Sequence, residues 1–411
     1  MLNNNGRGTA VAIGAWFALI APVGAQEDAS KSNESTTAPV VVTGTRVEQP
    51  SFDLPMAIDS VGQEEIQDAA KPEVNVSEVL NSVPGTYVPN RDSYAQEQQI
   101  VIRGFGARSQ FGTRGIKLLA DGIPVSTPDG QGSPGVFDLD TAQRIEVLRG
   151  PFSALYGNHS GGVVQLFTED GPPQPTLSAR AWAGSWDTWK AGVTFGGTAG
   201  GLNYIGNLSR FDTGGYRDHS AARKDQFTGK LGSKFAGGSS LSFVVNYLDQ
   251  PDNQDPLGLT AAQVAQDPQQ AGTNAVTFDT RRSLNNLQGG LVYEVPISDK
   301  DTLRAMLYAG NRTNDGYLAI PLTTQDGVRN SGGVSVLDRT FGGAGLRWTH
   351  QDKVAAMPFT VTTGVDYDTS TEDRLGYLNK FGVQGALKRA SRTASTASAP
   401  TSRPSCRPPR S

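Results

Sequence analysis

Beyond residue 176 the chain alternates apolar and polar residues with a period of two. Between Trp189 and Gly196, large apolar residues or alanine occupy every second position, and lysine, glycine and threonine fill the positions between them. The same alternation recurs over residues 241–247, 303–309 and 359–367. Successive side chains of a β-strand point to opposite faces, so each segment predicts a strand with one apolar face and one polar face.

Strands of this kind suit either a soluble sandwich or a barrel with lipid outside and a watery lumen inside. The linkers favour the barrel, because short ones such as 236–239 alternate with long ones such as 251–280, like periplasmic turns and extracellular loops. Aromatic residues near predicted strand ends favour a membrane interface; they are Trp182, Trp186, Trp189 and Trp348. We therefore predict part of a transmembrane antiparallel β-barrel, with about nine strands between Leu177 and Thr371.

Residues from about Ser51 to Asp170 predict a compact α+β domain, because short strands alternate with helical pieces. We expect a helix that Ser77 caps, with Val79, Leu80 and Val83 as its apolar stripe, ending before Pro84-Gly85. The expected strands of this domain are 99–103, 116–120, 123–126, 144–148 and 162–168. The whole chain is thus expected to be mainly β, with an α+β domain first and barrel strands after it.

The N-terminus has the features of a secretory signal peptide over residues 1–25. One arginine precedes the apolar stretch Thr9 to Val23, and small residues end at Ala25, where we expect cleavage. Residues 26–37 are polar and acidic and predict a disordered tether. The β-branched segment after them either lends a strand to a partner's sheet edge or forms the first strand of the next domain.

Composition excludes several classes of protein. Only 37% of the residues are hydrophobic, and no run is long enough for a membrane-spanning helix. The net charge of -4 and the lack of a compact basic stripe before the last 24 residues argue against a nucleic-acid partner. Cys406, the single cysteine, allows no internal disulfide or cysteine-based metal site.

No catalytic motif is present, so we expect neither an enzyme nor a cofactor. His159, His219 and His350 are far apart and form no His-Glu-x-x-His arrangement. No Gly-x-Ser-x-Gly elbow occurs, and the segment from Gly104 has only a fragment of a dinucleotide-binding fingerprint.

Five segments, taken in order, resemble the TonB-dependent receptor family of outer-membrane proteins. They read APVVVTGTR, SEVLNSVPGTYV, IVIRGFG, LLADGIPV and RIEVLRGPFSALYGNHSGGVVQLFT. The resemblance extends from Ala38 to about Leu387. It implies a TonB box at 38–46, a plug domain at 47–170, and at 171–387 the first part of a barrel of about 22 strands.

The resemblance also implies a mechanism and partners. In the family the plug closes the barrel lumen, ligand binding exposes the TonB box, and an inner-membrane complex pulls on that box using the proton-motive force. TonB is expected to pair edge-to-edge with one extended segment. Its residues are Ala38, Pro39, Val40, Val41, Val42, Thr43 and Gly44. We expect a monomer in outer-membrane lipid.

Two plug arginines are expected to lock the plug in place. In the family such arginines reach carboxylates on the inner barrel wall, which makes Arg103 and Arg149 the candidates here. The alternative is a pair of solvated surface arginines. Glycines follow both of them, and Gly157, Gly161 and Gly162 are expected to permit close approach of the last plug strands.

Ligand contacts are expected from outward-facing plug loops and from the extracellular loops. Arginine forks and amides suit the oxygen atoms of an anionic siderophore complex. The plug candidates are Arg91, Tyr94, Gln96, Arg108, Gln110 and Arg114. A ferric siderophore or similar iron complex is the expected ligand, although members of the family also import vitamin B12 or haem. An adhesin or a simple porin is the rival class, and the plug motifs argue against both.

The last 24 residues differ in composition from everything before them. Residues 388–411 hold six basic residues and no acidic one. They predict a segment that is not a strand and is not native to the family, with a disordered basic tail as the alternative. An open sheet of about nine strands would leave unpaired edges in lipid. We therefore expect the 411-residue chain not to insert as a working transporter.

Overall fold

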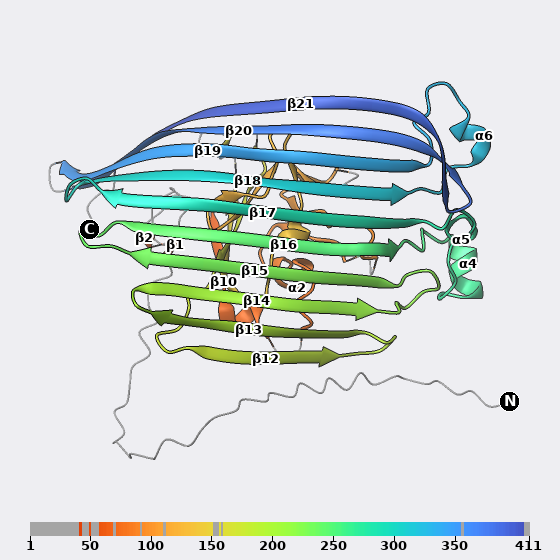
Figure 1. Cartoon of the computed structure of the whole chain (residues 1–411), viewed down its shortest axis with the longest axis horizontal. Helices are drawn as coiled ribbons and strands as arrows, with labels where there is room; N and C mark the ends of the chain where they lie inside the picture. The colour runs from red at the N-terminus through yellow and green to blue at the C-terminus, as the bar shows by residue number, and fades with distance from the viewer. Residues whose placement is uncertain are drawn as a thin grey trace, which may run out of the picture.

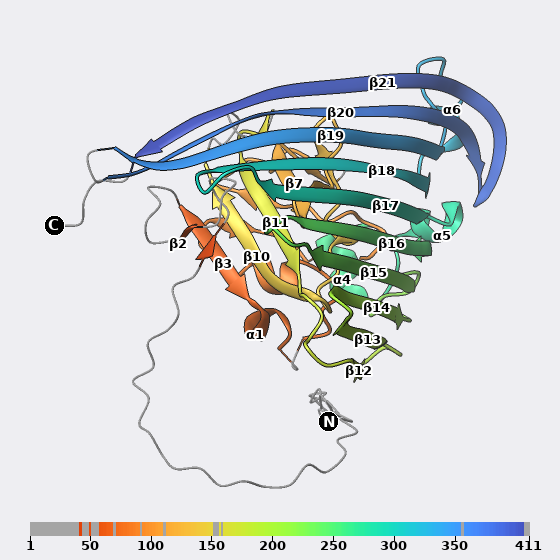
Figure 2. The same cartoon turned by 60° about the vertical axis from the view of Figure 1, so that its left-hand side comes forward.

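The structure is a computed structural model and has two parts. It describes residues 41–42, 49–50, 57–68, 71–90, 93–109, 112–150, 156–157, 159–354 and 357–406. An inner domain, residues 57–168, lies on the concave side of a curved antiparallel sheet of ten strands, which we call the wall (Figures 1 and 2). The two expected domains are therefore both present, and the chain is mainly β.

The inner domain is built on a five-stranded sheet with the order β3-β10-β11-β7-β8. Its strands are β3 Ile58–Gly62, β7 Ile116–Ala120, β8 Ile123–Pro124, β10 Ala142–Arg149 and β11 Gly162–Thr168. Among the described strands of this sheet, only β7 and β11 pair in parallel. Short pairs complete it: β4 Thr86–Tyr87 with β5 Val101–Ile102, and β6 Thr113–Arg114 with β9 Gln131–Gly132.

The helices in the described residues are all short. The inner domain has α1 Gln63–Ile66, α2 Ser77–Leu80 and the 3-10 turn η2 Pro134–Val136. The connections of the wall contain α4 Ala261–Gln266, α5 Thr273–Phe278 and α6 Leu322–Gln325. No helix in the described residues is long and apolar enough to cross a membrane.

The expected cap of α2 is wrong. Val76 is the N-cap residue, and Ser77 is buried inside the helix without a capping bond. The carboxylate of Glu78 reaches back instead, and accepts the backbone N–H groups of Glu73 at 2.7 Å and Asn75 at 2.8 Å. A carboxylate can satisfy several orphan amides at once, which a single hydroxyl cannot do.

The core of the inner domain continues into the wall. Ile66, Leu80, Ile102 and Ile145 are fully buried, and Leu248 and Leu284 of the wall join the same apolar cluster. Burial of apolar surface stabilises both domains at once. The inner domain is therefore packed against the wall as well as folded on itself.

The wall strands follow the chain in order, and each pairs antiparallel with the next. They are β12 Thr176–Ala183, β13 Trp189–Ala199, β14 Leu202–Thr213, β15 Ala222–Lys234, β16 Ser240–Gln254, β17 Arg281–Pro296, β18 Asp301–Tyr317, β19 Val334–Val354, β20 Met357–Lys380 and β21 Val383–Cys406. Strands β12 to β20 correspond to the predicted set.

The two ends of the wall differ in their connections. Residues 200–201, 235–239 and 297–300 connect strands at one end, which we call the short-turn end. The longer connections 214–221, 255–280 and 318–333 lie at the opposite, long-loop end. Figure 2 shows β3 toward the short-turn end of the wall. The inner domain therefore begins near that end.

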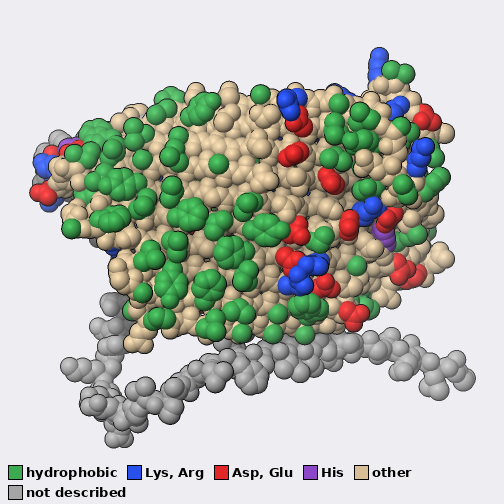
Figure 3. Space-filling view, in the orientation of Figure 1, with side chains coloured by type: hydrophobic (Ala, Val, Ile, Leu, Met, Phe, Trp, Pro, Cys, Tyr) green, Lys and Arg blue, Asp and Glu red, His purple; other side chains and the backbone are tan. Residues whose placement is uncertain are grey.

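The two faces of the wall have opposite character, as the alternation predicts. Large apolar side chains remain exposed on the outer face, and Figure 3 shows them as a broad apolar area, with charged side chains gathered toward the long-loop end. They include Val193, Leu208, Phe243, Leu291, Leu307 and Leu346. Polar residues of the inner face are buried against the inner domain, among them Lys190, Asn207, Lys224, Gln288 and Arg339.

Three of the four tryptophans fit the predicted interface. Trp186 and Trp189 are exposed near the long-loop end, and Trp348 is exposed near the other end. Trp182 does not fit, because it lies opposite the inward-facing Lys190 and is half-buried. Its position on β12 places it on the inner face of the wall, which is otherwise polar.

The predicted absence of a strand after residue 387 is wrong. β21 runs to Cys406 and pairs with β20 over most of its length, with Arg392 bonded to Asp373 at 2.6 Å. Backbone pairing depends little on side-chain composition when a neighbouring strand offers a free edge. The prolines Pro400 and Pro404 are tolerated because β21 is the last strand of the sheet. Residues 407–411 lie outside the described residues.

Candidate functional site

Buried ion pairs join the inner domain to the first two strands of the wall. Arg180 of β12 places Nη1 2.5 Å from Oε2 of Glu73, and Lys190 of β13 places Nζ 2.7 Å from Oδ1 of Asp140. Lys190 also donates to the backbone carbonyl of Glu73 at 3.0 Å. We call these four residues the Glu73 cluster. It fixes the inner domain against β12 and β13.

Burial sets the protonation of the Glu73 cluster. Burial raises the pKa of Glu73 to about 8, against the lowering effect of Arg180 and with a further raising effect from Asp140. For Asp140, burial acts to raise the pKa, but Lys190 outweighs it and holds that pKa below its usual range. Ionised Asp140 beside Glu73 thus favours the protonated form of Glu73.

The next two wall strands continue this attachment. Asn207 of β14 donates Nδ2 to Asp138 at 3.2 Å and to Asp140 at 3.3 Å. Lys224 of β15 donates Nζ to the carbonyl of Val74 at 2.9 Å. The inner domain is therefore held by strands β12 to β15 as one continuous surface.

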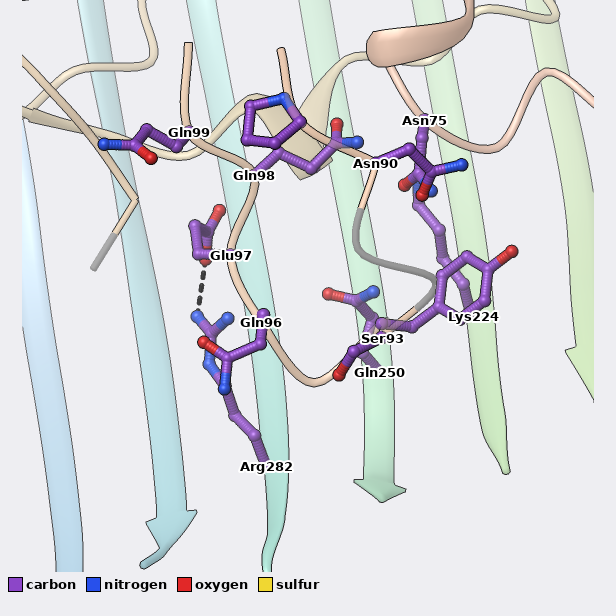
Figure 4. A pocket seen from close by; sticks show the side chains of 13 residues that line it. Asn75, Asn90, Ser93, Gln96, Glu97, Gln98, Gln99, Lys224, Gln250 and Arg282 are labelled. Atoms are coloured by element: carbon purple, nitrogen blue, oxygen red, sulfur yellow. Dashed lines mark hydrogen bonds and ion pairs between the residues drawn. The ribbon is translucent and has the colours of Figure 1, made fainter. Parts of the chain in front are cut away.

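A second attachment lies nearer the long-loop end, on β17 and β19. Arg282 places Nη2 2.5 Å from Oε2 of Glu97, as Figure 4 shows. Burial acts to raise the pKa of Glu97, but Arg282 and Arg312 outweigh it and hold that pKa below its usual range. Arg339 donates to the hydroxyl of Thr127 at 2.9 Å. Glu97 is thus a buried anion held by wall bases.

In these contacts the charges are the reverse of the prediction, in which plug arginines reach wall carboxylates. The bases belong mainly to the wall and the carboxylates to the inner domain, with Lys117 and Asp368 at 3.5 Å as an exception. The residues that reasoning from the sequence missed are single bases on the polar positions of alternating strands, such as Lys190. A base that is buried on the inner face needs a partner of opposite charge, so its position in the alternation could have predicted such a pair.

The two predicted locking arginines do not reach the wall within the described residues. Arg149 bonds Asp59 of β3 at 2.6 Å and the carbonyl of Pro84 at 2.7 Å. Arg149 ends β10, which pairs directly with β3, so the nearest carboxylate belongs to the same domain. Arg103 is exposed. Wall carboxylates as partners of Arg103 and Arg149 stay a prediction.

A small polar cavity marks the part of the inner domain nearest the long-loop end (Figure 4). Its volume is about 30 Å³, enough for water alone. Two predicted ligand residues line it. Tyr94 packs its ring against Phe211 at 4.8 Å between centroids, and Gln96 donates to the carboxylate of Asp255. The cavity itself has no room for a ligand larger than water.

The other predicted ligand residues are not gathered at this cavity. Arg114 is more than half exposed and lies 3.8 Å from Asp129. Arg108 is exposed. Arg91 and Gln110 lie outside the described residues. The structure thus brings Tyr94 and Gln96 together and leaves Arg108 and Arg114 on the surface.

The long loops are bonded to one another at the rim. Asn379 donates Nδ2 to the carbonyls of Phe278 at 2.9 Å and Leu318 at 3.2 Å. Gln325 donates to the carbonyl of Asn379 at 3.2 Å. Both amide side chains are fully buried. The rim above the inner domain is therefore a connected surface.

The predicted close approach is confirmed for Gly161 and Gly162, but not for Gly157, where a Cβ would meet only Cβ of Ala399 at 3.8 Å. A Cβ on Gly161 would lie 2.6 Å from Cβ of Phe105, and one on Gly162 would lie 2.3 Å from the carbonyl oxygen of Leu148. Gly104 has φ +86° and Gly150 has φ +146°, conformations that favour glycine.

Little of the predicted TonB-binding segment lies in the described residues. Val41–Val42 forms the short strand β1, which pairs antiparallel with β2, Gln49–Pro50. The remaining residues of 38–44 lie outside the described residues, as do the expected signal peptide, 1–25, and tether, 26–37.

Residues 50–164 match the model of the TonB-dependent receptor plug domain. This match identifies the inner domain as a plug of the TonB-dependent receptor type. The wall resembles in fold the barrel of such a receptor. Among solved structures, the unliganded ferric citrate transporter FecA gives a TM-score of 0.71 at 23% identity, over 85% of this chain and 53% of that chain. This likeness shows the fold alone.

Curated relatives match part of the chain. The vitamin B12 transporter BtuB of Photobacterium profundum is 30% identical over 211 residues, 51% of this chain and 33% of the relative. The ferrienterobactin receptor of Escherichia coli K12 is 30% identical over 179 residues, 39% of this chain and 19% of the relative. The chain spans a third or less of these relatives. They are receptors and transporters rather than enzymes.

Proposed function

We propose that a receptor with a complete barrel and this chain's plug and wall imports a ferric siderophore or a similar iron complex across the outer membrane of a Gram-negative cell, driven by TonB. The observation that carries the proposal is the docked plug. Residues 50–164 match a plug domain, and buried wall bases such as Lys190 and Arg282 hold it in the concavity of the wall. A ligand cannot pass a domain held in this way by diffusion, so import requires energy to move the plug.

The outer surface supports a place in the outer membrane. Apolar side chains such as Leu208 and Phe243 are exposed on the outer face, between exposed tryptophans toward both ends. This is the distribution expected of strands in lipid, with aromatic rings at the two interfaces. The short-turn end would then face the periplasm, where TonB can reach residues 38–44.

The ligand class rests on chemistry and relatives together. The plug presents an amide and a phenol, Gln96 and Tyr94, toward the long-loop end, and Arg108 and Arg114 remain exposed. Such groups suit the oxygen atoms of an anionic iron complex. Arg91 and Gln110 complete the proposed contacts. The ferrienterobactin receptor is among the relatives.

Vitamin B12 is the second candidate ligand. The relative that matches the longest stretch quoted above, 211 residues, is a vitamin B12 transporter. A hemin receptor of Yersinia pestis is 30% identical over 142 residues, so haem also stays among the candidate ligands.

Growth of a deletion strain tests the proposal. The strain is starved of iron and supplied with ferric citrate, ferric enterobactin or hemin, and in parallel it is grown on limiting vitamin B12. We expect it to lose growth on one ferric complex, and to regain it with the gene but not in a strain that lacks TonB. Unchanged growth on every iron source, with loss of growth on vitamin B12, would select the second candidate. Unchanged growth throughout would reject import.

A further inference from the structure

Arg312 of β18 is a buried base on the inner face of the wall that forms no ion pair within the described residues. Its side chain is 7% exposed, and its Nη2 has no hydrogen-bond partner there. Its Nε donates to Oδ1 of Asn286 of β17 at 3.0 Å. The wall is a single sheet, so an inward side chain this deeply buried is covered by the plug. A buried guanidinium needs an anionic partner.

Asn286 has a matching unpaired donor. It is fully buried, and its Nδ2 has no hydrogen-bond partner among the described residues. The Nε–H and Nη2–H bonds of a guanidinium point in parallel, so Nη2 of Arg312 extends beside the amide that already accepts from Nε. Two unpaired N–H groups therefore lie close together on the plug side of the wall. A single group that accepts from both would satisfy them.

The neighbouring pair, Arg282 and Asn314, shows which kind of group fits. Nε of Arg282 donates to Oδ1 of Asn314 at 2.7 Å, so this pair repeats the same contact on the same two strands. Nη2 of Arg282 lies 2.5 Å from the carboxylate of Glu97 (Figure 4). Arg312 has the amide contact but not the carboxylate. An anion beside Nη2 of Arg312 would complete the same arrangement.

The region around Arg312 holds more bases than carboxylates. Arg312 stands directly opposite Arg339 in the register of β18 and β19, and like charges in such positions repel. Glu97 and Asp129 attract Arg312 without forming an ion pair with it, and each already bonds another arginine. Together with Arg312, the described ion pairs of this region join five arginines to three carboxylates; they are Arg114, Arg282, Arg312, Arg339 and Arg374, with Glu97, Asp129 and Glu372. A water would leave this excess of positive charge unchanged, whereas an anion reduces it.

We propose that Arg312 and Asn286 form a binding site for a small inorganic anion such as chloride, between the wall and the plug. The anion accepts from Nη2 of Arg312 and from Nδ2 of Asn286. Arg282 and Arg339, on the strands to either side, both contact the plug, so the anion lies within the plug attachment. Its binding therefore strengthens the hold of the wall on the plug. The inference does not depend on which ligand is imported, or on import itself.

Thermal loosening of the plug tests the site, with chloride as the probe. The midpoint temperature for the appearance of protease-sensitive plug is measured in detergent-solubilised receptor with a complete barrel, in chloride and in gluconate at equal ionic strength. Gluconate is too large for a site that the plug encloses. We expect a midpoint several degrees higher in chloride, with a dependence on chloride concentration that follows mass action. Equal midpoints in the two salts would overturn the inference.

Asn286→Asp builds a permanent anion into the site. The substitution keeps the shape of the side chain and offers Arg312 a bidentate carboxylate. We expect the variant to reach in gluconate the midpoint that the parent reaches in chloride, and to lose the chloride dependence. Asn314→Asp is the matched control, because Arg282 beside it already bonds Glu97, and it should keep the dependence of the parent. Chloride dependence that persists in the first variant, or is lost equally in both, contradicts the assigned site.

Bromide covers the case in which Asn286→Asp does not fold. Crystals of the parent receptor are grown in bromide and measured at the bromine absorption edge. We expect an anomalous-difference peak within hydrogen-bonding reach of Nη2 of Arg312 and Nδ2 of Asn286. An ordered water at that position without an anomalous peak would assign the two donors to water and reject the anion.

Discussion

Arg282 of β17 and Glu97 of the plug lie 2.5 Å apart, although 185 positions separate them in the chain. Both side chains are largely buried. Through this pair the guanidinium of a wall residue contacts the plug at Glu97, which also accepts a hydrogen bond from Ser133. It is the clearest single attachment of the plug near the long-loop end.

Removal of Arg282 should therefore loosen the plug. Arg282→Ala leaves Glu97 as a buried anion, and breaking such a pair costs about 3–5 kcal/mol. The lower part of that range applies, because Arg312 and Ser133 still face Glu97. We expect a lower midpoint temperature for the appearance of protease-sensitive plug in detergent-solubilised receptor.

An exposed pair provides the matched control. Arg392 of β21 and Asp373 of β20 lie 2.6 Å apart, but both are solvent-exposed. Surface pairs of this kind contribute little. Arg392→Ala should leave the midpoint unchanged, and an equal shift in both variants would refute the role given to Arg282.

Glu73 predicts a pH dependence of plug attachment. Its pKa is raised from 4.5 to about 8 in the folded protein. The folded state therefore binds the extra proton between these values, so the stabilisation is complete below pH 4.5 and is lost as the pH rises through 8. We expect the plug to become protease-sensitive at lower temperature above pH 8 than near neutrality.

Glu73→Gln tests the assignment, because an amide keeps the shape but does not titrate. The variant should lose the fall in midpoint around pH 8. Persistence of the same fall in Glu73→Gln would assign it to another group. Asp140 has a lowered pKa, so its contribution is lost only as the pH falls into the acid range.

Gly162 should not tolerate a side chain. Gly162→Ala would place Cβ 2.3 Å from the carbonyl oxygen of Leu148, in a backbone that cannot move away without breaking the β10–β11 pairing. We expect a destabilisation of about 1–3 kcal/mol, typical of overpacking. Gly104 also has a positive φ but has open space around its Cβ position, so Gly104→Ala separates strain from collision. Thermal melting that ranks the two variants equally would argue against the collision.

Val41 lies in the segment proposed to bind TonB. Val41→Pro removes a backbone donor that a strand pairing with TonB needs. We expect loss of ligand uptake with normal binding of ligand at the cell surface. Val41→Ala keeps the donor and should retain most uptake. Normal uptake in the proline variant would place the coupling segment elsewhere.

The architecture could be predicted because the strands follow from short-range patterns in the sequence. The alternation around Trp189 predicts both that the segment is a strand and which of its side chains face inward or outward, since the period of a strand is two. The end of the wall was not predictable in the same way. Residues 388–406 lack apolar alternation, yet they pair along the edge of β20, and that contact depends on a neighbour rather than on local sequence.

The candidate site was predicted less well, because its contacts join distant segments. Arg149 was expected to reach a wall carboxylate, but β10 pairs with β3, and so Asp59 is nearer than any wall carboxylate among the described residues. The bases that do hold the plug, such as Lys190, look like ordinary polar-face residues in the sequence. Only the register of the wall against the plug reveals their partners.

The placement of these bases has a consequence for the order of assembly. Synthesis runs from the N-terminus, so Glu73 and Glu97 are made before their partners Arg180 and Arg282, which lie 107 and 185 positions later. Until the wall strands exist, these carboxylates have only water to hydrate them, and Leu248 and Leu284 are missing from the core. The plug therefore cannot make its full set of buried contacts until the wall strands are present, although its sequence comes first.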